Sequence, residues 1–414
     1  MKDYRARWCE PLLSAALKVM PVVVVTGARQ TGKTTLVRHA PGLGERRFLS
    51  LDQFDILEQA ERDPDSLLDE LPVTIDEVQR APSLLLAIKR KVDAGRRPGM
   101  ILLTGSANFS LFDKINESLA GRASYLELPP FCPAEARGEG ADETGIDALM
   151  QDDFSTAAWP RQKSGDWQDW MLRGGYPGIM DEPDSASRDI WFSGYVQTYL
   201  ERDLRQLSNV GNLADFQRVM RLASLRLSRL VNQSDLSRES GVPQPTVHRY
   251  LNLLETGYQV ARLTNYQRNA GKSLARARKL QWTDAGLGAW LAGISTGNIA
   301  ARDDRGFFLE QLVFQTLQSW RSLGLRRHLH FWREGTHEVD FVIEENGVLV
   351  GIEVKAGRQV RSDGLRGLLA FQHSFAHGGK KPRGIVLYAG PEARSLGDNL
   401  YALPLAAFAP GLAE

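Results

Sequence analysis

The chain has 414 residues, too many for a single hydrophobic core, and at about 150 residues each its length indicates roughly two to four domains. Its apolar content of 43% and charged content of 24% are ordinary for globular proteins. The formal net charge of +1 excludes a global attraction to nucleic acid or membrane, so a charged partner would have to bind a local patch.

Two cysteines, Cys9 and Cys132, lie far apart and show no metal-ligand spacing. This usage is expected in a reducing cytoplasm. The first residues lack an apolar signal segment, and no apolar stretch reaches the roughly 18 residues that cross a bilayer. We therefore expect a cytoplasmic protein with no membrane partner.

The N-terminal part alternates predicted strands with predicted helices. Its first strand is an unbroken run of valines from residue 22, typical of a strand buried on both faces. A glycine-bounded loop and an amphipathic helix follow it. Further strands are predicted at 46–52, 72–79, 99–108 and 123–131, with a helix at 84–95. This alternation indicates a parallel sheet with right-handed crossovers.

The loop after the first strand matches the phosphate-binding pattern G-x-x-x-x-G-K-[ST]. It reads Gly27, Ala28, Arg29, Gln30, Thr31, Gly32, Lys33, Thr34. The glycines let successive backbone N–H groups face the phosphates of ATP, and the next helix adds the positive end of its dipole. We expect Lys33 at the β- and γ-phosphates, Thr34 on Mg²⁺ and Thr35 near the α-phosphate. A chance match in a turn is the alternative, which the flanking strand and helix disfavour.

Polar residues end the next two strands. Asp76 is expected to hold Mg²⁺, and Glu77 to polarise the attacking water. Two surface acids at a strand end are the alternative. Ser106, with Thr104 or Asn108 in its place, is expected to orient the water or sense the γ-phosphate, although a hydrogen-bonded turn would give the same pattern.

Arg122 lies just before the fifth predicted strand. It is a candidate arginine finger, acting within its own chain or on a neighbouring subunit of a homo-oligomer. A surface salt bridge is the alternative.

These motifs occur as the phrases TGARQTGKTTL, IDEVQ, LTGSAN and SLAGR, followed by LRGGYP (172–177) and YLERDL (199–204). In this order they resemble an AAA-type (ASCE-class) P-loop ATPase family of bacteria and archaea. That family joins an AAA-like ATPase to a C-terminal domain of unknown function. The resemblance covers nearly the whole chain and implies ATP binding, the strand order of AAA proteins, and roles linked to DNA or to regulation.

The middle of the chain changes character. Residues 137–168 are rich in Gly, Asp, Glu, Ser and Gln, which predicts a long surface connection or lid. Helices are predicted at 189–207 and 215–231. Residues 234–250 then read as a helix-turn-helix, with Gly241 in the turn.

The second helix of this motif carries side chains suited to DNA. These candidates are Gln244, Thr246, His248 and Arg249, and the basic segment 261–280, which includes Arg276, Arg278 and Lys279, suits the wing of a winged helix on a phosphate backbone. Winged helices also serve as protein-interaction modules or as ATPase lids. Contact with DNA and contact with protein therefore both remain open.

The C-terminal part resembles the PD-(D/E)XK nuclease core. Asp340 is on one predicted strand, Glu353 and Lys355 share a face of the next, and Glu310 is on the preceding helix. In such cores the acids hold a metal and the lysine steadies the attacking water. A lysine salt-bridged on a strand pair gives the same pattern, and a nuclease-like domain can bind without cutting.

Together these patterns predict an α/β fold with four segments. They are an AAA-type ATPase domain (1–136), a lid or linker (137–208), a winged-helix-like domain (209–290) and a nuclease-like domain (291–414). The leading hypothesis is an ATPase, dependent on ATP and Mg²⁺, whose cycle acts on DNA or is regulated by it. The alternatives are an ATP-gated, metal-dependent DNA nuclease, and a nucleotide-dependent switch or scaffold for a protein partner.

Overall fold

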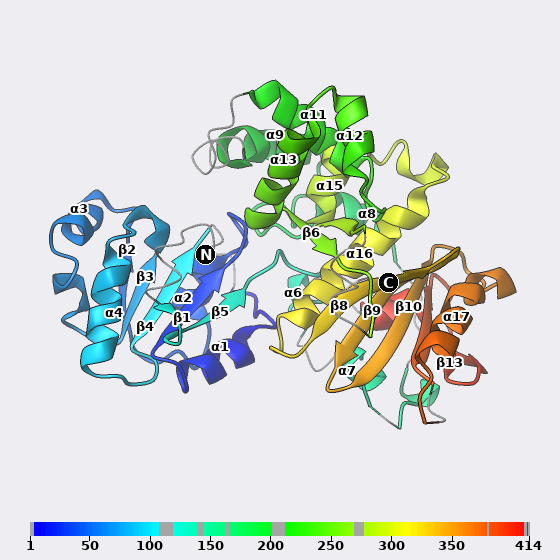
Figure 1. Cartoon of the computed structure of the whole chain (residues 1–414), viewed down its shortest axis with the longest axis horizontal. Helices are drawn as coiled ribbons and strands as arrows, with labels where there is room; N and C mark the ends of the chain where they lie inside the picture. Colours follow the sequence, from blue (N-terminus) through cyan, green and yellow to red (C-terminus); the bar gives the residue numbers. More distant parts are fainter. Residues whose placement is uncertain are drawn as a thin grey trace. The chain divides into compact units, whose positions relative to one another are not determined.

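The computed structural model describes residues 4–106, 119–139, 145–151, 153–159, 161, 165–200, 212–268, 277–378, 381–409 and 412. The chain forms two compact units (Figure 1). Unit 1 comprises Met1–Pro130 and Thr256–Tyr258, and unit 2 comprises Phe131–Glu255 and Gln259–Glu414. Among the described helices, none is long and apolar enough to cross a membrane.

Unit 1 is built on a five-stranded parallel sheet with the order β2-β3-β4-β1-β5. The strands are β1 (Val22–Thr26), β2 (Arg47–Ser50), β3 (Val73–Asp76), β4 (Ile101–Gly105) and β5 (Ala123–Glu127). All five strands therefore end at one edge of the sheet, where the polar residues that follow β1, β3 and β4 meet. The predicted parallel α/β sheet is confirmed.

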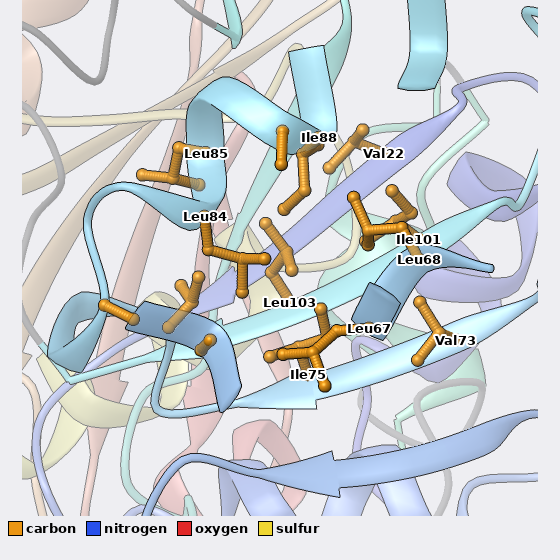
Figure 2. Packing of buried hydrophobic residues seen from close by; sticks show 14 of the residues in the cluster. Val22, Leu67, Leu68, Val73, Ile75, Leu84, Leu85, Ile88, Ile101 and Leu103 are labelled. Atoms are coloured by element: carbon orange, nitrogen blue, oxygen red, sulfur yellow. The ribbon is translucent and has the colours of Figure 1, made fainter. Parts of the chain in front are cut away.

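Helices cover both faces of this sheet. They are α1 (Glu10–Leu17), α2 (Lys33–His39), α3 (Phe54–Arg62), α4 (Leu84–Ala94), and the short turns η1 (Ser66–Leu68) and η2 (Val78–Arg80). Successive valines of β1 point to opposite faces. Val22 and Val24 pack with α4 and η1 (Figure 2), whereas Val23 and Val25 pack with α1 and α2. Both faces of β1 are buried, which explains the unbroken apolar run.

The first part of unit 2 is helical. Its helices and turns are α6 (Pro133–Ala136), α7 (Ile146–Leu149), η5 (Thr156–Ala158), α8 (Trp167–Arg173), α9 (Ser185–Tyr195), the π-helix η6 (Val196–Leu200), α11 (Leu213–Ser224), α12 (Gln233–Ser240), α13 (Gln244–Thr256), α15 (Ala285–Leu291) and η7 (Ile299–Ala301). Helix α12, a left-handed turn at Gly241 (φ +68°) and helix α13 form the expected helix-turn-helix. Strands β6 (Val260–Leu263) and β7 (Lys279–Trp282) then pair in antiparallel fashion. The segment between them includes Arg276, which lies outside the described residues.

The second part of unit 2 is a six-stranded mixed sheet with the order β12-β13-β11-β10-β9-β8. The strands are β8 (His328–Glu334), β9 (His337–Glu345), β10 (Val348–Lys355), β11 (Arg383–Tyr388), β12 (Arg394–Gly397) and β13 (Leu400–Pro404). The accompanying helices are α16 (Arg305–Arg321), η8 (Ser362–Leu365), α17 (Arg366–Phe375) and α18 (Leu405–Phe408). Helices α16 and α17 lie beside the sheet in Figure 1, and α17 packs on β9, β10 and β11.

Helix α16 is buried around its whole circumference from Phe308 to Trp320. Buried polar side chains normally need hydrogen-bond partners inside the protein, and two glutamines of this helix have them. Gln311 accepts from the Trp282 backbone N–H at 2.9 Å. Gln315 accepts from the Ala285 N–H at 2.9 Å and donates to the Phe131 carbonyl at 2.6 Å.

The segment predicted as a surface connection or lid, 137–168, differs from expectation in its described residues. Ile146 and Leu149 of α7 are fully buried within unit 2. The Arg383 guanidinium donates to the carbonyls of Leu149 and Gln151, and the Trp320 indole donates to Asp147 at 2.8 Å. The polar composition predicts a solvated loop. In the structure, buried apolar residues and backbone carbonyls of residues 146–151 hold this segment against the C-terminal part of unit 2.

Candidate functional site

The backbone of the phosphate loop is shaped by residues that adopt positive φ angles. Gly27 has φ +143°, and a Cβ there would lie 2.4 Å from the Leu128 carbonyl oxygen, so only glycine fits. Gln30 and Gly32 have φ +60° and +93°, and Gly32 is the N-cap of α2. The loop thus curls back at the amino end of a helix, an arrangement that binds phosphate.

Side chains hold this loop in its curled form. The Lys33 ammonium is buried and donates to the carbonyls of Gly27 at 3.0 Å and Ala28 at 2.6 Å. The Thr31 hydroxyl also donates to the Ala28 carbonyl, at 3.0 Å. Thr35 is exposed on the first turn of α2, and Arg29 is half-buried.

Arg7 also holds the phosphate loop in place, a role that the sequence analysis did not predict. Its guanidinium is buried, with 4% exposure, and donates to the Thr31 carbonyl at 3.0 Å and to the Pro129 carbonyl at 2.6 Å. It therefore ties the phosphate loop to the segment that follows β5. No motif marks Arg7, since its partners are backbone carbonyls 24 and 122 residues away.

Thr34 and Asp76 meet at the carboxyl edge of the sheet. The Thr34 hydroxyl lies 3.0 and 2.9 Å from the two carboxylate oxygens of Asp76. The Thr104 hydroxyl also donates to Asp76 and thereby orients it. A hydroxyl and a carboxylate are hard oxygen donors, the kind that Mg²⁺ accepts beside a bound phosphate. These two residues therefore fit the predicted magnesium position.

Glu77 is held in a left-handed conformation, with φ +59°. Its backbone N–H donates to the Thr104 hydroxyl at 3.1 Å. The Gln79 amide donates to the Glu77 carboxylate and, at 3.0 Å, to the Ser106 hydroxyl. Glu77, Gln79 and Ser106 thus form one polar cluster beside Asp76. Gln79 was present in the IDEVQ phrase but had been assigned no role, and Asn108 lies outside the described residues.

Arg122 lies at the opposite side of the sheet, beside the amino-terminal end of β1. Its carbonyl accepts from the Val22 N–H at the start of β1, whereas the phosphate loop follows Thr26 at the end of that strand. Its guanidinium forms a two-pronged pair with Asp93, at 2.6 and 2.8 Å. This hydrogen-bonded pair raises the pKa of Arg122 and lowers that of Asp93. Arg122 therefore lies at the opposite end of β1 from the phosphate loop, which disfavours an arginine finger acting within the same chain.

The chain is similar in sequence to two curated proteins. Two mycobacterial proteins, named uncharacterized protein Rv2008c of Mycobacterium tuberculosis and uncharacterized protein Mb2031c of Mycobacterium bovis, are each 32% identical over 356 residues. Each alignment covers 83% of this chain and 72% of the relative. The chain belongs to the family of these proteins.

Three family models match this family member in succession. Residues 20–136 match an AAA domain, residues 164–298 a domain of unknown function (DUF8612), and residues 305–408 another (DUF4143). The N-terminal part is thus an AAA-type P-loop ATPase domain, and DUF4143 covers the six-stranded sheet.

Two solved structures share weaker similarity. The Walker-type ATPase PABY2304 of Pyrococcus abyssi is 16% identical, with a TM-score of 0.43 over 70% of this chain and 99% of that one. A STAND protein with a tetratricopeptide repeat sensor, PH0952 of Pyrococcus horikoshii, is 12% identical, with a TM-score of 0.26 over 78% and 48%. Both scores are below 0.5, too low to establish a shared fold.

Unit 2 of this AAA-domain protein holds a second cluster of charged side chains. The structure brings together all four residues expected there, Glu310 on α16, Asp340 on β9, and Glu353 and Lys355 on β10. Asp340 accepts from the Val354 N–H at 2.8 Å, and Lys355 pairs with Glu353 at 2.6 Å. Burial raises the pKa of Glu310 and that of Glu353, the latter to about 8.

Lys279 joins this cluster, which corrects its predicted role. It was expected on a DNA-facing wing, but its side chain is only 1% exposed and its ammonium pairs with Glu310. It also lies 3.2 Å from Glu338 and 3.4 Å from Asp340. A buried ammonium cannot contact a phosphate backbone, so Lys279 is removed from the candidate DNA-binding residues, whereas Arg278 is half-buried.

The other candidate DNA-binding residues lie on α13. Gln244, His248 and Arg249 are exposed, and Thr246 is half-buried. His248 hydrogen-bonds Gln233 at 3.2 Å and Asn252 at 3.0 Å. The outer face of this helix is therefore polar along its first two turns.

The two glycines of the LRGGYP phrase pack closely against Asp284 and the Phe131 backbone. The Gly175 N–H donates to the Asp284 carboxylate at 2.6 Å. A Cβ on Gly174 would lie 2.4 Å from Asp284, and one on Gly175 would lie 2.0 Å from the Phe131 carbonyl oxygen. Asp284 is fully buried at the N-cap of α15, and burial raises its pKa to about 6. The described part of the YLERDL phrase ends at Leu200, in the π-helix η6.

Proposed function

We propose that this protein binds ATP with Mg²⁺ at the phosphate loop and hydrolyses it. The carrying observation is the approach of the Thr34 hydroxyl to the Asp76 carboxylate, at 2.9 to 3.0 Å, beside the loop. Thr34 and Asp76 would hold the magnesium ion, which supplies charge neutralisation at the phosphates. The AAA domain match over residues 20–136 supports the same proposal.

The remaining roles follow from the contacts within and beside the loop. Lys33 leaves the carbonyls of Gly27 and Ala28 and donates to the β- and γ-phosphates. Glu77 accepts a hydrogen bond from the attacking water, and Gln79, which donates to both Glu77 and Ser106, fixes its position. Such positioning accounts for much of the rate in phosphoryl transfer.

Phosphate release and nucleotide binding, measured on the same preparations, test this proposal. Lys33→Ala should abolish both. Glu77→Gln should retain binding and lower release by roughly 100-fold or more, since it removes the group that positions the water. Thr35→Ala is the matched control, because its side chain is exposed at the next position. Absence of phosphate release by the wild-type protein, with or without DNA, would refute hydrolysis.

DNA is the second candidate partner, and the polar outer face of α13 favours it. In this proposal α12, α13 and the β6–β7 pair act as a winged helix, and Gln244, Thr246, His248 and Arg249 face the duplex. Gel shifts over a range of salt concentrations test it. Gln244→Ala with Arg249→Ala should weaken binding, whereas unchanged affinity would favour the nucleotide-dependent switch that binds a protein partner.

The proximity of Asp340, Glu353 and Lys355 leaves an ATP-gated nuclease as a third proposal. It requires nicking of DNA that depends on Mg²⁺ or Mn²⁺ and is lost in Asp340→Ala and Lys355→Ala. Equal cutting by these variants and the wild type would assign the activity to a contaminant. Arg122 acting on a neighbouring subunit of a homo-oligomer is likewise a proposal, and ATPase activity that rises with protein concentration would support it.

A further inference from the structure

Lys279 places an ammonium group inside the carboxylate cluster of unit 2. It lies on β7, whose four residues are all buried, and its own side chain is 1% exposed. An ammonium has three N–H donors. Three carboxylates surround this one, with Glu310 in direct contact and with Glu338 and Asp340 at 3.2 and 3.4 Å.

The other charged side chains around the cluster come from β8 and β10 of the six-stranded sheet. Glu353 and Lys355 on β10 pair with each other at 2.6 Å, and Arg333 on β8 lies 3.8 Å from Glu338. The second carboxylate oxygen of Glu353 is buried and has no hydrogen-bond partner within the part of the chain that the structure describes. Buried carboxylates normally need a cation or donors to offset their lost hydration.

We propose that Lys279 is the resident cation of this site, in the position that a divalent metal would occupy between Glu310, Glu338 and Asp340. The site therefore takes a hard divalent cation, Mg²⁺ or Mn²⁺, only when the ammonium is removed. A divalent cation beside the buried ammonium would be repelled, because like charges a few ångströms apart in a buried site repel strongly.

The surroundings of the site agree with this assignment. Lys355 lines a cavity of about 620 Å³ with Arg358 and Arg361. A divalent cation approaching from that cavity would meet positive charge first. This assignment therefore argues against the ATP-gated nuclease, which would need a metal ion among these carboxylates.

Mn²⁺ binding by the whole chain, measured without nucleotide, tests the assignment. Every protein in this experiment carries Thr34→Ala, which weakens the metal position at the phosphate loop, and the protein with this change alone is called the parent. Binding is followed by electron paramagnetic resonance, and stability by thermal melting with and without Mn²⁺. We expect no Mn²⁺ in unit 2 of the parent. Lys279→Met should bind one Mn²⁺ per chain and melt at a higher temperature when Mn²⁺ is present. Lys279→Arg, which keeps the charge, should do neither.

Two results would overturn the proposal. One is Mn²⁺ binding by the parent that is lost in Asp340→Asn, which would show that a metal already occupies the site. The other is a folded Lys279→Met variant that gains no Mn²⁺. If Lys279→Met does not fold, Lys279→Gln replaces it, since its neutral amide still donates hydrogen bonds to the carboxylates. None of these results depends on ATP, so failure here leaves the proposed ATPase untouched.

Discussion

The buried carboxyl group of Asp284 makes the stability of unit 2 depend on pH. Burial raises its pKa from 3.8 to about 6, although the N–H groups of Gly175, Leu287 and Gly286 act in the opposite direction. The folded protein therefore holds this proton to higher pH than the unfolded chain does. A raised carboxyl pKa contributes stability that is complete below the unfolded value and is lost as pH rises through the folded value.

The size of the effect follows from the shift. A difference of about two pKa units, at about 1.4 kcal/mol for each unit, corresponds to about 3 kcal/mol. The free energy of unfolding should thus lose up to about 3 kcal/mol from this group as pH rises from about 4 to about 7. Asp284→Asn cannot ionise, and its amide oxygen still accepts at the N-cap, so it should lack this contribution.

Urea unfolding of the wild type and of Asp284→Asn, measured at several values between pH 4 and pH 7, tests this reasoning. The difference in unfolding free energy between the two proteins should shift in favour of Asp284→Asn as pH rises. Asp181→Asn is the control, since the Asp181 side chain is exposed. Parallel pH profiles for the wild type and Asp284→Asn would show that the carboxyl titrates as it does in water and would refute the argument.

Three further outcomes are expected. Gly175→Ala should destabilise the protein by about 1–3 kcal/mol or more, because the new Cβ would lie 2.0 Å from the Phe131 carbonyl oxygen. Gly194→Ala is the control, since a Cβ there meets nothing within 4 Å. Equal losses of thermal stability in the two variants would contradict this prediction. Gln79→Ala should retain ATP affinity and lower phosphate release by roughly tenfold, since it leaves the Glu77 carboxylate unheld; a lower affinity with unchanged turnover would place Gln79 in binding instead. Arg122→Ala should leave ATP affinity unchanged in a fluorescent-nucleotide titration, because its guanidinium pairs with Asp93 at the far edge of the sheet; a roughly tenfold loss of affinity would contradict that placement.

Local patterns were enough to predict how the phosphate-loop residues and Asp76 come together. The valine run of β1, the loop that follows it, and the acids at the end of β3 lie within short windows, and parallel strands bring their carboxyl ends together. The structure places Thr34 next to Asp76, as the motif predicts. Arg7 escaped prediction because its partners are backbone carbonyls, which carry no sequence signal.

Lys279 shows why the rest could not be predicted. In the sequence it belongs to a basic run that resembles a solvated face. Its carboxylate partners are 31 to 61 residues further along the chain, and only the packing of β7 beside α16 and β9 brings them to it. Strand β8 was likewise missed, because its alternating histidines and aromatics lack the strong apolar run that marks β1.

Helix α16 also sets the limits of what can fold independently. Two family models meet between residues 298 and 305, immediately before this helix. Yet Gln311 and Gln315 hydrogen-bond the backbone at Trp282, Ala285 and Phe131, all of which precede that boundary. A chain cut at residue 300 would leave two glutamines without partners on one fragment and a bare apolar surface on the other. The two matched regions therefore share the buried helix α16, and we expect neither to fold stably without the other.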